Sequence, residues 1–380
     1  MAERLDLNLN GPVLPPPDGI ESNLDNPPNR NALVIGLTSF FLAISLISLL
    51  VRAYAKLLYM KNTQTFGDLL IIPAIGTYTA GSIIVFRIAI TSGFFVHGWD
   101  FRLKDLSWFY YNLFLGTQLY LATMITLKSA ILVEWARIFG PGSSKLFRWS
   151  CYILVALNAI YYTVNIILEC TACIPREYYW DKTIPGGTCR YSAILSLISA
   201  LVNLVFDVAI LILPQGVLWR LTMSRRKRVG CTVVFVIGLL ACACAALRIA
   251  FGVAYVSSDD YTYLLSPQTI LCNAEIAAGF LVFAAPAAPK PMLYLTQQVI
   301  GSVNQLIRSA RSSSRGTATG AESGFDSQSG PFKSLFSRKK LRSDLYDPID
   351  KHDDLALRKF SSWKDPNVSE QRPLMSSSIE

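Results

Sequence analysis

The sequence has little charge and little histidine. Asp, Glu, Lys and Arg make up 16% of its 380 residues, whereas they make up about a quarter of a soluble domain. It contains two histidines, of which His97, beside Trp99, is either a pH-sensitive group or a structural one. No Ser/His/Asp set, phosphate-binding loop or dinucleotide-binding fingerprint can be recognised. We therefore expect a protein that is not an enzyme and that holds no metal and no cofactor.

Hydrophobic residues, by contrast, make up 52% of the chain and gather in seven long stretches. A helix of about 20 apolar residues crosses the hydrocarbon of a bilayer. Inside lipid the backbone must satisfy its own hydrogen bonds, which a helix does. The sequence therefore predicts an all-α fold, a bundle of seven transmembrane helices. The predicted spans are Ala32–Val51, Asp68–Ile90, Leu106–Val133, Trp149–Leu168, Ser192–Leu213, Cys231–Ala254 and Gln268–Pro289.

The Lys and Arg residues of the loops predict how the bundle is oriented. Eleven of them fall in the loops after the first, third and fifth spans, and five fall in the other three loops. Short loops rich in Lys and Arg stay on the cytoplasmic side. The N-terminus is therefore predicted outside and the C-terminus inside. The net charge of +9 is a topology signal on this interpretation, and we expect no nucleic-acid partner.

The chain divides into three predicted regions. Residues 1–31 are polar and Pro-rich and predict a disordered extracellular tail, and residues 32–295 form the membrane domain. Residues 296–380 are rich in Ser, Arg, Lys and Asp and predict a disordered cytoplasmic tail. We expect no cleavable signal peptide, so that the first span inserts as a signal anchor. The expected location is the plasma membrane, with lipids as immediate partners.

Three cysteines lie close together in the predicted fourth loop. This loop is predicted to be external, where disulfides persist. Cys173 and Cys189 would close a loop of roughly 15 residues, which is worth about 3 kcal/mol in the chain-entropy model. We expect this pair, with Cys170 as the odd thiol. Free thiols and a Cys170–Cys189 bond are the alternatives.

Six ionisable residues lie within or at the ends of the predicted spans, where charge is costly and commonly functional. A rise of about 1.5 Å per helical residue sorts them by depth into two layers. One interpretation is an outer ligand pocket above an inner ionic lock, and the other is two structural salt-bridge clusters. Equal depth also predicts an ion pair between Arg248 and Glu275. The outer layer holds Arg87, Arg248 and Glu275, and the inner layer holds Asp68, Lys128 and Asp207.

An ordered set of short motifs runs through the predicted spans and loops. It comprises Arg52-Ala-Tyr, Phe66-Gly67-Asp68, His97-Gly98-Trp99, Lys128-Ser-Ala-Ile-Leu132, Cys173-Ile-Pro175 and Cys189, Asn203 with Asp207, Arg248, and Glu275. This set resembles the fungal rhodopsin domain family of seven-helix membrane proteins. The resemblance covers about residues 32–295 and implies a surface receptor or sensor.

Retinal does not fit this chain, despite the family's name. The last predicted span carries no lysine for a Schiff base, and Lys290 lies at its inner boundary. We expect a receptor with a small extracellular ligand and a cytosolic signalling partner at the third and fifth loops. A transporter and a membrane scaffold are the alternatives. Flux of a substrate through the protein reconstituted in vesicles would identify a transporter. If a ligand recruits no cytosolic partner to the third and fifth loops, a scaffold is favoured.

Overall fold

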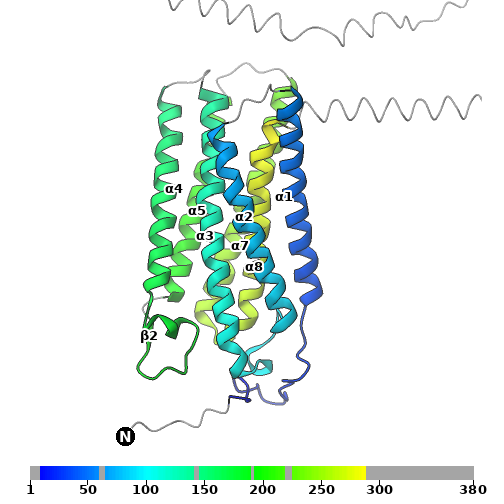
Figure 1. Ribbon diagram of the computed structural model, residues 1–380, viewed down its shortest axis with the longest axis vertical. Coiled ribbons are helices and arrows are strands. Elements are labelled where there is room, and N and C mark those ends of the chain that lie inside the picture. The colour runs from blue at the N-terminus through cyan, green and yellow to red at the C-terminus, as the bar shows by residue number, and fades with distance from the viewer. Residues whose placement is uncertain (1–8, 60–64, 141–144, 190–191, 219–224, 288–380) are drawn as a thin grey trace, which may run out of the picture. The chain divides into compact units, whose positions relative to one another are not determined.

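The computed structural model describes residues 9–59, 65–140, 145–189, 192–218 and 225–287 (Figure 1). Seven helices within these ranges are long and apolar enough to cross a membrane, which confirms the predicted class. They are α1 (Asn31–Tyr59), α2 (Phe66–Thr91), α3 (Leu103–Phe139), α4 (Lys145–Thr171), α5 (Ser192–Ile212), α7 (Arg225–Ser257) and α8 (Tyr261–Ala284). The short elements are η1 (Gly98–Asp100), β1 (Cys173–Ile174), η3 (Arg176–Tyr179), β2 (Thr188–Cys189), α6 (Gln215–Leu218) and η4 (Ala285–Ala287). The predicted tail at 296–380 lies outside the described residues.

The seven long helices pack side by side, with α3 the most enclosed. Helix α3 contacts α2, α4 and α8, α1 contacts α2 and α8, and α7 contacts α5 and α8. The N-terminal segment and the β1–β2 hairpin lie at the same end of the bundle (Figure 1). We call this the outer end, following the predicted orientation, and the opposite end the inner end.

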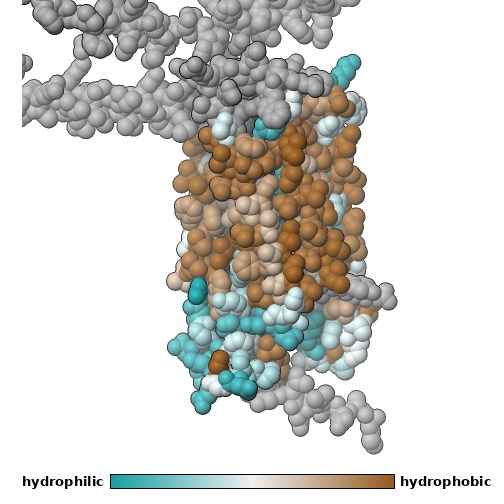
Figure 2. All heavy atoms as spheres, turned by 180° about the vertical axis from the view of Figure 1, so that it is seen from behind, coloured by the Kyte–Doolittle hydropathy of each residue, from teal (hydrophilic) through white to brown (hydrophobic). Residues whose placement is uncertain are grey.

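The bundle carries apolar side chains on its outside and several polar ones within. Leu50, Ile90 and Leu146 are largely exposed, whereas Ser45 and Asn158 are fully buried. Figure 2 shows an almost continuous hydrophobic surface over the helices and hydrophilic residues gathered at the outer end. Lipid solvates apolar groups well, so buried polar groups can hold membrane helices together by hydrogen bonds. This distribution is the one that a multi-pass membrane protein requires.

Two of three groups of buried apolar side chains fill most of the interior. The larger one, from α2, α3, α4, α5 and α8, includes Met124, Tyr162 and Phe280. The second lies at the outer end and includes Phe94 and Phe109. Charged residues within the helices are therefore surrounded by well-packed side chains, which fixes their positions.

The N-terminal segment is ordered from residue 9 onward. The amide of Val13 donates to the carbonyl oxygen of Gly98 at 3.1 Å, and the amide of Arg30 donates to that of Phe94 at 3.1 Å. Residues 9–31, predicted as a disordered tail, therefore have defined backbone partners in the structure. Composition reports that a segment has few apolar residues, but it does not report the backbone partners that a neighbouring loop supplies.

Several helices extend beyond their predicted spans, among them α1, which continues to Tyr59 instead of ending at Val51. Helix α3 continues to Phe139 instead of ending at Val133, and α8 begins at Tyr261 instead of Gln268. Hydropathy ends a span where polar residues appear, but a helix continues as long as its backbone hydrogen bonds do. Helix α8 runs through Pro267, which membrane helices tolerate. The extensions of α3 and α8 change the depth of the charged residues along these two helices.

Candidate functional site

Four charged side chains from four helices meet in the middle of the bundle, and we call them the charge quartet. Lys128 Nζ of α3 lies 2.7 Å from Asp207 Oδ1 of α5 and 3.9 Å from Glu275 Oε1 of α8. Arg248 Nη1 of α7 lies 3.8 Å from Glu275 Oε2. All four side chains are at most 12% exposed. Two cations face two anions, so the quartet is formally neutral.

Three polar side chains complete the hydrogen bonding of the quartet. Asn203 Nδ2 donates to Glu275 Oε1 at 2.7 Å, while Asn203 Oδ1 accepts from Lys128 Nζ at 2.8 Å. The Tyr162 hydroxyl donates to the same Asn203 oxygen. The Tyr120 hydroxyl donates to Glu275 Oε2 at 3.3 Å. Buried charges persist when they are paired and hydrogen-bonded, and these contacts supply both conditions.

The two predicted layers are wrong for Lys128 and Asp207. Both lie with Arg248 and Glu275 instead of with Asp68. For Lys128 and Glu275 the reason is the extra length of their helices: α3 runs more than a turn further inward, and α8 starts almost two turns further out. Asp207 joins them through its pair with Lys128, although α5 ends within one residue of its predicted end. Lys128 and Glu275 therefore share the middle of the bundle. The structure also brings Arg248 and Glu275 together.

Asp68 belongs to a second cluster, the inner-end cluster, which joins α1, α2 and α3. Arg52 Nη2 lies 3.2 Å from Asp68 Oδ1 and 2.9 Å from Glu134 Oε1. Lys56 also pairs with Asp68, and the Thr65 hydroxyl donates to Asp68 Oδ2 at 2.6 Å. Arg52 and Lys56 follow the predicted first span, which ends at Val51, but both lie in the last turns of α1. They remain at the inner end, where they neutralise carboxylates.

Arg87 lies apart from both clusters. It is exposed near the outer end of α2, with its guanidinium carbon 5.8 Å from the centroid of the Trp108 ring. The predicted outer layer therefore does not form, because Arg87 faces outward while Arg248 and Glu275 face the interior. A cation above an indole ring near a membrane interface is a stable arrangement that needs no acidic partner.

His97 fastens the loop after α2 to the start of α8. Its ring is stacked between Trp99 and Tyr263, with centroids 4.2 and 4.3 Å away. His97 Nδ1 lies 2.5 Å from Asp260 Oδ2, and the amide of Gly98 donates to the other oxygen of that carboxylate at 2.9 Å. These contacts favour the structural interpretation of His97. Its pH sensitivity stays a prediction.

A cavity of about 440 Å³ lies between the charge quartet and the outer end. Its walls come from α2, α3, α4, α5, α7 and α8, and Tyr179 and Lys182 reach it from the loop between α4 and α5. Ligand pockets typically measure about 300–1,000 Å³. Tyr120 and Arg248 belong both to the cavity wall and to the polar network around the quartet. Six tyrosines line the cavity: Tyr78, Tyr110, Tyr120, Tyr179, Tyr255 and Tyr261.

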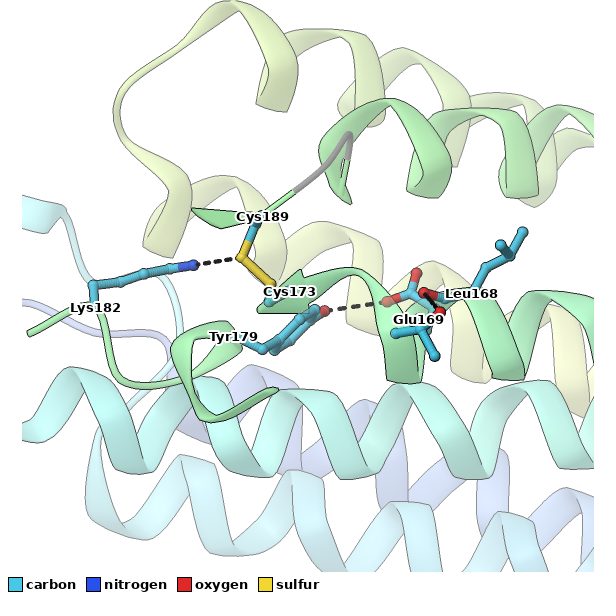
Figure 3. Close-up of a disulfide and its surroundings, with 7 residues drawn as sticks. Leu168, Glu169, Cys173, Tyr179, Lys182 and Cys189 are labelled. Atoms are coloured by element: carbon cyan, nitrogen blue, oxygen red, sulfur yellow. Dashed lines mark hydrogen bonds between the residues drawn. A yellow bond between two sulfur atoms is a disulfide. The ribbon is translucent and has the colours of Figure 1, made fainter. Parts of the chain in front are cut away.

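A disulfide-closed hairpin holds the loop residues of this cavity (Figure 3). Strands β1 and β2 pair antiparallel with Cys173 opposite Cys189, and the predicted bond between them is confirmed. The Tyr179 hydroxyl donates to Glu169 Oε2 at 3.3 Å. Burial, with Glu169 nearby, raises the pKa of Tyr179 far above its usual range, and burial lowers the pKa of Lys182. The hairpin therefore brings a neutral phenol and the Lys182 side chain to the cavity wall, and the Lys182 ammonium itself contacts Cys189 Sγ at 3.4 Å (Figure 3).

Several site residues had no predicted place in the site, although helical spacing could have indicated one, and Asn203 among them was named only as part of the motif set. Tyr120 lies eight residues before Lys128 on α3, and Asn203 lies four residues before Asp207 on α5. Both spacings place the two side chains of a pair on one helix face. Glu169 was missed because it falls just past the predicted end of the fourth span.

Comparison with known proteins gives matches over most of the membrane domain. The sequence model of the fungal rhodopsin domain matches residues 51–293. The fugralins biosynthesis cluster protein 2 of Gibberella zeae is 38% identical over 287 residues, covering 75% of this chain and 71% of that protein. A SAT4 family membrane protein of Emericella nidulans is 30% identical over 45% of this chain and 43% of that protein. Receptor GIN3 of Arthrobotrys oligospora is 23% identical over 58% of this chain and 53% of that protein. No solved structure matches significantly.

Proposed function

The chain belongs to the fungal rhodopsin domain family of membrane proteins, and from this premise we propose that it is a receptor of the plasma membrane. Its ligand is a small molecule that enters the cavity from the outer end. The observation that carries the proposal is that the cavity wall includes Arg248, a member of the charge quartet, and Tyr120, which contacts Arg248. The similarity to a protein named Receptor GIN3 supports the same function.

The charge quartet offers a physical link between the cavity and the inner end. Arg248 faces the cavity and shares Glu275 with Lys128, which in turn pairs with Asp207 on α5. A ligand that draws Arg248 away from Glu275 leaves Lys128 as the cation that pairs with Glu275. Discrete rearrangements of buried pairs are the kind of change that helices transmit. Helices α3 and α5 lead toward the third and fifth loops, where we place a cytosolic signalling partner.

Retinal has no part in this proposal, because the residues present do not fit it. Helix α8 carries no lysine for a Schiff base. Lys128 lies on α3, is hydrogen-bonded to Asn203 and paired with Asp207, and does not line the cavity. Lys182 lines the cavity, but it lies in the loop between α4 and α5. We derive no light-driven step.

Two glycines of α2 provide a test of the cavity as the ligand site. Gly81 lines the cavity, and a Cβ there meets its nearest neighbour, Leu119 Cβ, at 3.8 Å, so Gly81→Leu should fill the cavity without a clash at Cβ. Gly76 faces open space on the same helix, so Gly76→Leu is the matched control. A library of small molecules is screened for thermal stabilisation of the purified full chain, since a ligand of the native state raises its apparent stability.

Hits should stabilise the unmodified protein and the Gly76→Leu variant and should lose their effect on Gly81→Leu. If no compound depends on Gly81 in this way, the cavity is not a ligand site and the receptor proposal fails. The transporter alternative is tested with the same hits in liposomes that contain the protein. Protein-dependent flux of a hit across the vesicle membrane would favour transport over reception.

A further inference from the structure

Arg248 has a buried hydrogen-bond donor without a partner. The residue is 7% exposed, and its Nε finds no acceptor among the residues that the structure describes. Its Nη1 donates to the Tyr120 hydroxyl at 2.5 Å and to Cys272 Sγ at 3.4 Å. An unsatisfied buried donor is costly, and it is normally explained by a group that binds there. Because Arg248 lines the cavity, its guanidinium is the cationic group that a ligand in the cavity meets beside Tyr120.

The charges on the cavity wall favour an anion. Arg248 and Lys182 are the cations of the described wall, and Glu169 is its one carboxylate. Glu275, which lies 3.8 Å from Arg248, stands behind the wall as part of the quartet. The wall therefore has one more positive than negative charge. A guanidinium binds a carboxylate through charge-assisted hydrogen bonds, which are stronger than neutral ones.

The remaining wall favours an aromatic framework. Tyr110, Tyr255 and Tyr261 line its outer part, and Ile84 and Val85 add aliphatic surface. Aromatic rings pack well against such rings in edge-to-face and offset arrangements. A cavity of about 440 Å³ has room for a molecule of two or three rings.

From these observations, and resting on the receptor function proposed above, we propose that the ligand is an aromatic carboxylate. Its rings pack among the tyrosines, and its carboxylate accepts hydrogen bonds from the guanidinium of Arg248. The carboxylate then competes with Glu275 for the guanidinium. Glu275 then loses part of its interaction with Arg248 and pairs more strongly with Lys128. Binding of this anion therefore changes the ion pairs within the quartet.

Three biphenyl compounds of nearly equal shape test this class. Biphenyl-4-carboxylate is compared with biphenyl-4-methanol and with biphenyl-4-methylammonium by thermal stabilisation and by calorimetric titration of the purified full chain. The carboxylate should bind with a Kd at least about tenfold lower than the alcohol, as a hydrogen bond to a charged group allows. The ammonium should not bind. Gly81→Leu should abolish binding of the carboxylate, and Gly76→Leu should leave it unchanged.

Two variants assign the preference to Arg248. Arg248→Lys keeps the charge but lacks the Nε donor, and the double variant Arg248→Gln with Glu275→Gln removes the pair together and leaves no unpaired charge. Arg248→Lys should show a smaller preference for the carboxylate, because it keeps the charge but lacks the planar guanidinium. The double variant should bind carboxylate and alcohol with nearly equal Kd. A preference for the carboxylate that survives in the double variant would overturn the role of Arg248. No binding of the carboxylate to the unmodified protein would overturn the ligand class. Other hits that depend on Gly81 would then leave the receptor proposal standing, and their absence would reject both.

Discussion

At the scale of single residues, Lys128 and Arg248 illustrate two ways of keeping a cation in the membrane interior. Lys128 Nζ has a carboxylate at 2.7 Å and an amide oxygen at 2.8 Å. Arg248 has Glu275 farther away, at 3.8 Å, and a buried donor without an acceptor in the described residues. Lys128 is therefore well matched by the protein, whereas Arg248 is better suited to accept a further partner.

Removing one member of the Lys128–Asp207 pair should be strongly destabilising. Lys128→Met leaves Asp207 and Glu275 with Arg248 as their shared cation, and loss of one partner of a buried pair costs about 3–5 kcal/mol. The double variant Lys128→Met with Asp207→Leu should regain most of that loss, because the remaining Arg248–Glu275 pair is neutral. The measurement is the free energy of unfolding in detergent, taken as a double-mutant cycle.

Arg87→Met is the control for this cycle, because Arg87 is exposed and outside the quartet. It should change the free energy of unfolding by about 0.5 kcal/mol or less. Effects of Lys128→Met and Asp207→Leu that simply add up in the double variant would contradict the pair.

At the scale of elements, the hairpin between α4 and α5 connects the outer end to the cavity. Its disulfide joins residues 16 positions apart, and between them lie Tyr179 and Lys182, which line the cavity. Tyr179 also packs against Phe114 of α3, with ring centroids 5.1 Å apart. The bond therefore restricts the two side chains that the loop contributes to the site.

Cys189→Ser should lower the stability of the outer end. A closed loop of this length is worth about 3 kcal/mol in the chain-entropy model, so the melting temperature should fall. A reducing agent should lower the melting temperature of the unmodified protein and leave that of the variant unchanged. The control is Cys170→Ser, since Cys170 lies outside the bond and makes a 4.0 Å contact with Gln118 Oε1. An equal response of both variants to reduction would contradict the assignment.

The helices could be predicted from the sequence because lipid leaves the backbone no other choice, and hydropathy reports this constraint directly. The depth of Lys128 and Glu275 could not be predicted as well, since it depends on where α3 and α8 end. Polar residues near a helix end do not tell whether the helix continues. The cavity could not be predicted either, because it depends on how side chains from six helices leave space between them. The ordered N-terminal segment depends on partners in a distant loop.

At the scale of the whole molecule, the apolar outside and the neutral quartet inside suit a multi-pass membrane protein (Figure 2). The cavity lies toward one end, and the inner-end cluster holds α1, α2 and α3 together at the other. A small molecule at the first end and a protein at the second would therefore meet different parts of one bundle. The receptor proposal needs the two ends to be coupled through the quartet.

The most direct test of this coupling is ligand-dependent partner recruitment in intact cells. A hit of the stability screen is added outside cells that carry the full chain with a proximity-labelling enzyme fused to its C-terminus. The cytosolic proteins labelled should change on addition of the compound for the unmodified protein and for Gly76→Leu, and should not change for Gly81→Leu. The same labelling pattern with and without a compound that demonstrably fills the cavity would contradict the receptor account.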